Sequence, residues 1–272
     1  MSTTSPDPLK FRLTHRTATS PPLQYFEDRS IEFEVVNISS EVLLLEAVQL
    51  KFEADTGAVP NYVDASPGLR LPPNESGMIK IDVRPLPLYK EYTNQFDALL
   101  RFRPETHGRL GKLSTERHDG FYIIINTPAA TLGDVFVSFK QPEDQRLANI
   151  LERYTKRAGF TPHLFMRNPA VGADQWKSIE KLIKQSHSMF VVWGRRTEWG
   201  EGVGKEIELC RRRRMREIPL VEEGLVLPDA YQNTNCTYKR YDPEDPAHVL
   251  SETVSSLRVQ VLASQRSRHN RA

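Results

Sequence analysis

Hydrophobic and polar residues alternate in short stretches through the first half of the chain. In residues 31–39 the alternation has the period of two typical of a strand with one buried face, and it places Ile31, Phe33 and Val35 together. Similar stretches occupy residues 41–53, 78–86, 97–105 and 120–128. Because no segment before residue 130 has a helical period, we predict an antiparallel β-sandwich of immunoglobulin-like size over residues 8–128, with an irregular barrel as the alternative.

The pattern changes after residues 126–133, a stretch rich in Pro, Gly, Ala and Thr that we interpret as a linker. Residues 134–139, DVFVSF, are almost continuously apolar, as in a strand buried on both faces. Residues 141–159 have a helical period, with Pro142 expected in the first turn and Gly159 at the C-terminal cap. The second half therefore begins as a strand followed by a helix.

Strands and helices then alternate to the end of the chain. Further strands are predicted at 162–166, 189–193, 218–224 and 237–241, and further helices at 175–186, from about residue 203, and from residue 245. Five strands alternating with helices predict a parallel, doubly wound sheet over residues 133–263, followed by a basic tail at 264–272. Since ligands bind beyond the carboxyl ends of such strands, we expect the segments 138–144, 166–174 and 193–202 to lie on one rim.

The composition is that of an ordinary soluble globular protein. The 272 residues suit two domains, and 37 Lys and Arg residues nearly balance 35 Asp and Glu residues. No apolar run approaches the roughly 18 residues that cross a bilayer, so we expect a cytoplasmic protein with no membrane partner. Cys210 and Cys236 are too few for a disulfide framework, and no paired Cys or His spacing predicts a metal site.

Residues 198–210, EWGEGVGKEIELC, raise the question of which glutamate could do chemistry. A helix that begins near Val203 turns about 100° per residue and buries a stripe of Val203, Ile207 and Cys210. Glu206 lies about 60° from the centre of this stripe, whereas Glu208 lies about 140° away, toward solvent. Glu206 could be a partly desolvated catalytic carboxylate or only a complement to the helix dipole, and its spacing leaves both open.

The order of these elements resembles the Toll/interleukin receptor (TIR) domain family over residues 133–263. The resemblance is carried by VFVSF, a helix ending in RAGF, then HLFMRNPAVGADQ, SIEKLIKQSHSMFVVW, a tryptophan followed by VGKEIELC, and IPLV. It implies a flavodoxin-like sheet of five parallel strands with helices on both faces. In enzymatic members of the family, a glutamate at this helix start breaks the bond between nicotinamide and ribose in NAD, and the resemblance assigns that role to Glu206.

The resemblance places a substrate site around Glu206, with NAD as substrate and no cofactor. Phe139 would stack on a ring, Lys140 would contact phosphate, and the tryptophans would flank the nicotinamide. Arg167 would contact phosphate or take part in assembly. Each of these side chains could instead have no role in binding. An aromatic side chain could simply pack in the core, and a cation could be a solvated surface charge. The expected substrate-binding residues are Ser138, Phe139, Lys140, Arg167, Trp193 and Trp199.

The resemblance to prokaryotic TIR proteins also implies partners and a role. We expect a homo-oligomer or filament formed by the TIR-like domain, a protein partner for the sandwich domain, and activity that follows assembly or a trigger such as infection. The product could be linear or cyclic ADP-ribose. The alternative function is a non-catalytic adaptor that assembles through residues 166–174.

A cluster of arginines, Arg211 to Arg214 with Arg216, raises the possibility of nucleic-acid binding. Consecutive arginines on a helix point about 100° apart, so they do not all face one phosphate track. We therefore expect a solvated or protein-facing patch and no nucleic-acid partner.

Overall fold

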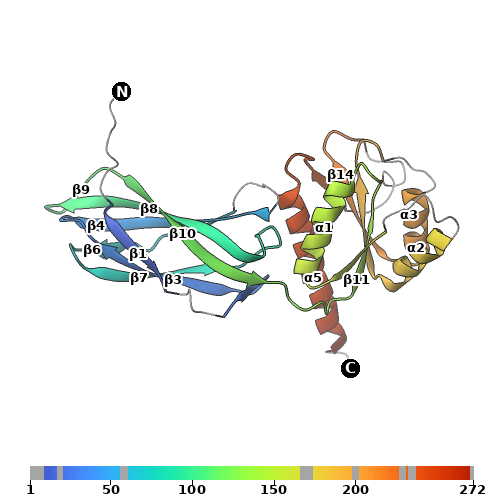
Figure 1. Ribbon diagram of the computed structural model, residues 1–272, viewed down its shortest axis with the longest axis horizontal. Coiled ribbons are helices and arrows are strands. Elements are labelled where there is room, and N and C mark those ends of the chain that lie inside the picture. The colour runs from blue at the N-terminus through green and yellow to red at the C-terminus, as the bar shows by residue number, and fades with distance from the viewer. Residues whose placement is uncertain are drawn as a thin grey trace. The chain divides into compact units, whose positions relative to one another are not determined.

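The computed structural model describes residues 9–16, 21–55, 61–165, 174–197, 202–226, 231 and 237–269. The chain forms two compact units, a β unit and an α/β unit (Figure 1). The β unit comprises Met1–Ala54, Val59–Pro85 and Tyr89–Asn126, and the α/β unit comprises Asp55–Ala58, Leu86–Leu88 and Thr127–Ala272.

The β unit consists of a small sheet and a larger sheet. The small sheet is antiparallel in the order β1 (Phe11–His15), β3 (Arg29–Asn37) and β7 (Ser76–Val83). The larger sheet has the order β2 (Leu23–Gln24), β10 (Ser114–Asn126), β8 (Tyr92–Thr106), β4 (Val42–Phe52) and β5 (Asn61–Ala65), with β6 (Leu69–Leu71) on β4 and β9 (Arg109–Leu110) on β8. Its pairings are antiparallel except that of β2 with β10.

Aromatic side chains join the two sheets. The ring of Phe33 in β3 lies 5.5 Å from that of Phe121 in β10 and 6.1 Å from that of Phe96 in β8, measured between centroids. The predicted face of Ile31, Phe33 and Val35 is confirmed, because all three side chains are buried. The alternation in the sequence therefore reflects strands that bury one face against the other sheet.

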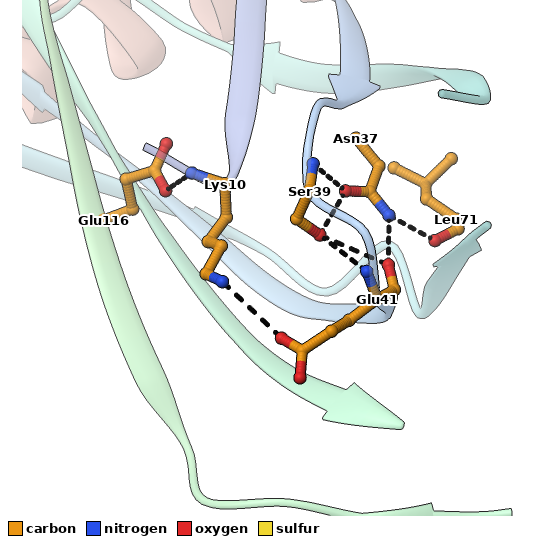
Figure 2. A network of polar contacts seen from close by, with 6 residues as sticks. All are labelled: Lys10, Asn37, Ser39, Glu41, Leu71 and Glu116. Atoms are coloured by element: carbon orange, nitrogen blue, oxygen red, sulfur yellow. Dashed lines mark hydrogen bonds and ion pairs between the residues drawn. The ribbon is translucent and has the colours of Figure 1, made fainter. Parts of the chain in front are cut away.

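A buried asparagine organises the end of β3 (Figure 2). The amide nitrogen of Asn37 donates to the backbone oxygens of Glu41 at 2.7 Å and Leu71 at 2.8 Å. Its amide oxygen accepts from the backbone nitrogen of Ser39 at 2.9 Å and from the Ser39 hydroxyl at 2.7 Å. Since the side chain is fully buried, these bonds replace the water that its amide loses on folding.

The α/β unit contains a parallel sheet of five strands, as predicted. The strand order is β12 (Thr161–Leu164), β11 (Asp134–Ser138), β13 (Ser188–Trp193), β14 (Arg216–Glu222) and β15 (Lys239–Tyr241). Helices α1 (Gln145–Arg157) and α5 (Ala247–His269) pack together on one face of the sheet, and α2 (Asp174–Gln185) and α3 (Val203–Arg212) pack together on the other (Figure 1).

Several boundaries differ from the predicted ones. Pro142 does not lie in the first turn of α1, because residues 141–144 form a turn and the helix begins at Gln145. Gly159 does follow the end of α1, with a φ of 86°. Helix α5 continues to His269, so most of the expected basic tail is helical.

The arginine cluster does not form a continuous helical run. Helix α3 ends at Arg212, Arg213 caps it, and Arg214 has a φ of 54°. Arg211 pairs with Glu217 at 2.7 Å, and its guanidinium lies 5.1 Å from the centroid of the Tyr231 ring. At least Arg211 of this cluster therefore contacts other parts of the protein.

No helix in the described ranges is long and apolar enough to cross a membrane.

Candidate functional site

A serine and a glutamate from distant parts of the chain meet in the α/β unit. The hydroxyl of Ser138, the last residue of β11, donates to Oε2 of Glu206 in the first turn of α3 at 2.5 Å. Ser138 is 1% exposed and Glu206 is 4% exposed. The sequence-predicted residues Ser138 and Glu206 are thus brought into direct contact.

The order of the strands explains where this contact forms. The chain starts in β11, goes to β12 at the edge, and returns past β11 to β13, so the winding direction reverses between β11 and β13. In open α/β sheets, the carboxyl ends of the strands at such a reversal are where ligands bind. Ser138 lies at the carboxyl end of β11, and Glu206 follows the carboxyl end of β13.

The helical period of α3 places Glu206 as predicted. Val203, Ile207 and Cys210 are buried and belong to a hydrophobic core cluster, whereas Glu208 is exposed. Gly202, at the N-cap position, has no side chain to accept hydrogen bonds from the helix start. The carboxylate of Glu206 therefore lies near the positive end of the helix dipole and also on the inner side of the helix.

The segments that flank this pair contact each other through polar side chains. The ammonium group of Lys140 donates to the backbone oxygen of Arg196. The hydroxyl of Thr197 donates to Oδ2 of Asp144 at 2.9 Å and accepts from the backbone nitrogen of Gly194 at 3.1 Å. Burial raises the pKa of Asp144, and the hydrogen bond from Thr197 acts in the opposite direction.

A second acidic group, Glu222 at the end of β14, lies near enough to Asp144 for its charge to raise the pKa of Asp144. Glu222 accepts a hydrogen bond from the backbone nitrogen of Arg195 at 3.1 Å and forms an ion pair with the Arg195 guanidinium at 2.5 Å. Burial raises the pKa of Tyr241, and the nearby charges of Asp144 and Glu222 raise it further. The predicted rim is confirmed for the segments 138–144 and 193–197, since Lys140 and Asp144 contact Arg196 and Thr197. Asp144, Thr197 and Glu222 were not singled out from the sequence, because the spacing does not show which side chains of these loops meet.

The other expected substrate-binding residues have different surroundings. Phe139 is 8% exposed and Trp193 is 7% exposed, and Trp193 packs in the same core cluster as Val203 and Ile207. Their proposed contacts with NAD stay predictions. Arg167 and Trp199 lie outside the described residues.

A cavity of about 300 Å³ lies elsewhere in the α/β unit. It is lined by the first residues of β14, including Arg216 and Ile218, by Lys239 of β15, and by Leu257 and Gln260 of α5. Because β14 and β15 begin here, this cavity is at the amino ends of the strands and is separate from the Ser138–Glu206 pair.

Within the described part of the chain, no three His, Cys, Asp or Glu side chains gather as metal ligands would.

Comparison with known proteins identifies no family. No protein-family model matches the chain, and no curated protein matches it. Among solved structures, a CMP N-glycosidase from Clostridium botulinum is 18% identical, covering 43% of this chain and 97% of its own, with a TM-score of 0.34. A structural-genomics target, SoR45, is 12% identical, covering 43% and 87%, with a TM-score of 0.32.

A third solved structure aligns with a larger part of the chain. A family 123 glycoside hydrolase from Clostridium perfringens is 9% identical, covering 72% of this chain and 42% of its own, with a TM-score of 0.25. Scores this low carry no conclusion about the function of the present chain.

Proposed function

We propose that the α/β unit cleaves the bond between nicotinamide and ribose in NAD, with Glu206 as the catalytic carboxylate. The observation that carries the proposal is the contact between Ser138 and Glu206, two buried polar residues at the reversal point of the sheet. The choice of NAD comes from the resemblance of residues 133–263 to TIR domains. The contact supports Glu206 as the catalytic carboxylate, and the resemblance supports NAD as the substrate.

One carboxylate suffices for this reaction. Most glycosidases use two, because a poor alkoxide leaving group must be protonated as it departs. In NAD the bond breaks with its electron pair going to the cationic pyridinium nitrogen, so nicotinamide leaves as a neutral molecule and needs no general acid. The remaining requirement is to stabilise an oxocarbenium-like ribose, which an ionised carboxylate in a water-poor site can do.

Glu206 would also direct the attacking nucleophile. A water molecule forms the new bond to the ribose carbon and passes its proton to the Glu206 carboxylate, which returns it to solvent, with ADP-ribose as the product. A hydroxyl of the substrate in the same position would give a cyclic product instead. Ser138 would keep one carboxylate oxygen in a fixed position through the reaction, since its hydroxyl donates to Oε2.

Assembly and triggering are part of the same proposal. We propose that the α/β unit acts as a homo-oligomer, that the β unit recognises a protein partner, and that the output serves prokaryotic antiviral defence by consuming NAD. The alternative is a non-catalytic adaptor that assembles through residues 166–174, most of which lie outside the described residues. The two functions differ in whether NAD is consumed.

The test is NAD consumption by the full chain, followed by chromatography with identification of the products. It should be run at several protein concentrations, with and without cell extract as a trigger, while light scattering reports assembly. Release of nicotinamide together with linear or cyclic ADP-ribose supports the enzyme. Assembly under every condition with all NAD recovered would support the adaptor instead.

A further inference from the structure

Two loops at the carboxyl end of the sheet are tied together at three points. The first loop comprises residues 138–144; the second part comprises residues 194–197, which follow β13, and residues 202–206 at the start of α3. Ser138 bonds to Glu206, Lys140 bonds to the backbone oxygen of Arg196, and Asp144 bonds to Thr197. The same short loop therefore contacts both the residues that follow β13 and the first turn of α3.

The bond between Asp144 and Thr197 lies in close packing. Thr197 is 7% exposed, and its hydroxyl has both a carboxylate acceptor and a backbone donor. A Cβ atom added at Gly194 would lie 2.4 Å from Oδ1 of Asp144, which is closer than real Cβ atoms approach other atoms. Alanine at this position would therefore push the Asp144 carboxylate away from its place beside Thr197.

We infer that the Asp144–Thr197 hydrogen bond is a positioning contact for Glu206. It holds the end of the loop 138–144 against residues 194–197, while Ser138, at the beginning of the same loop, holds the carboxylate itself. This inference rests on the proposed function for its catalytic consequence, but the structural coupling is independent of the substrate.

The coupling has a specific kinetic consequence. A carboxylate that acts mainly in the transition state affects kcat when it moves, whereas weaker substrate binding raises KM. Misplacement of a catalytic group by about 1 Å can cost on the order of 100-fold in rate. Loss of the contact should therefore lower kcat and leave KM nearly unchanged.

The experiment compares Thr197→Val with Thr197→Ser in the full chain. Valine keeps the branched shape and removes the hydroxyl, whereas serine keeps the hydroxyl. Steady-state kinetics with NAD give kcat and KM, and amide hydrogen exchange reports the order of the α3 start at Glu206 and Ile207. Gly194→Ala provides a second perturbation of the same contact from the opposite side, and circular dichroism checks that each variant is folded.

We expect Thr197→Val to lower kcat by roughly 10-fold to 100-fold with KM within about twofold, and to speed exchange at Glu206 and Ile207. Thr197→Ser should resemble the wild type in both measurements, and Gly194→Ala should resemble Thr197→Val. Folded valine and serine variants that agree with each other in kcat and in exchange would overturn the inference.

The failure of the proposed function would be visible separately. If wild-type protein consumes no NAD under any condition, the NAD-cleaving function is wrong. The exchange rates at Glu206 and Ile207 then still decide whether the contact positions the start of α3. Faster exchange in the valine variant alone supports that coupling, and equal exchange in both variants contradicts it.

Discussion

Ser138 and Glu206, 68 positions apart in the chain, form a hydrogen bond of 2.5 Å between two almost fully buried side chains. Burying a carboxylate costs free energy unless hydrogen bonds or charges compensate it, so such a group is kept near an apolar core only with partners. Ser138 is one such partner, and it comes from the strand where the winding of the sheet reverses.

Replacing Ser138 by alanine should weaken both folding and turnover. Removal of the donor leaves the buried carboxylate with one bond fewer, which should lower the free energy of unfolding by about 1–3 kcal/mol. NAD consumption should fall as well, because the carboxylate loses a fixed orientation. Urea denaturation and initial rates measure the two effects.

Ser188→Ala is the matched control for Ser138→Ala. It removes an equally buried hydroxyl from the amino end of the neighbouring strand β13, away from Glu206. This control should keep wild-type turnover. Equal loss of turnover in both variants would contradict a specific role for Ser138.

Asp144→Asn should change how stability depends on pH. Burial raises the folded-state pKa of Asp144 above its unfolded value, so the favourable contribution is complete at acidic pH and is lost as the pH rises through the folded-state pKa. Asparagine is neutral throughout and keeps an oxygen that can accept from Thr197.

The stability of Asp144→Asn relative to wild type should therefore increase between pH 4 and pH 7, the range of carboxyl titration. Chemical denaturation of both proteins at the two pH values measures the difference. A variant that instead loses relative stability toward neutral pH would show that the charged carboxylate is favourable in the folded state.

Gly159→Ala should be more destabilising than Gly224→Ala. Both glycines have a left-handed φ, 86° and 80°, so alanine should cost about 1–2 kcal/mol of backbone strain at each. At Gly159 the new Cβ would also lie 3.1 Å from the guanidinium of Arg258, which donates to the Ala158 oxygen, whereas nothing lies within 4 Å at Gly224. Thermal unfolding compares the two, and equal losses would contradict a role for crowding.

Asn37→Ala should destabilise the β unit by about 2–4 kcal/mol, because it leaves the backbone oxygens of Glu41 and Leu71 without their bonds to this amide. Ser39→Ala is the milder comparison, since Ser39 is partly exposed. Denaturation followed by a probe in the β unit measures both. If Asn37→Ala is at least as stable as Ser39→Ala, the proposed role of the buried amide is contradicted.

The sequence predicts those secondary-structure elements whose hydrophobic pattern or capping residue lies within the element itself. The stripe of α3, the glycine that follows α1, and the continuously apolar strand at β11 all depend on neighbouring residues, and the structure confirms them. Short strands such as β1 and β5 were not predicted, because their few residues acquire a strand conformation by pairing with β3 and β4. Local patterns contain little information about such pairing.

The candidate site was predictable only in part. The inward orientation of Glu206 follows from the helical period, and the position of Ser138 follows from its place at the end of a strand. Asp144 was expected at a helix start and in a segment on the same rim as residues 193–202, but its pairing with Thr197 was not predicted. A tertiary contact of this kind has no signature in spacing.

The most direct test of Glu206 as the catalytic carboxylate is NAD consumption by wild type, Glu206→Gln and Glu208→Gln under identical conditions. The two substitutions remove one carboxylate each from the same helix, and only Glu206 is buried against Ser138. We predict that wild type and Glu208→Gln consume NAD, and that folded Glu206→Gln consumes NAD at least about 100-fold more slowly than wild type. Turnover by Glu206→Gln at the wild-type rate would contradict it.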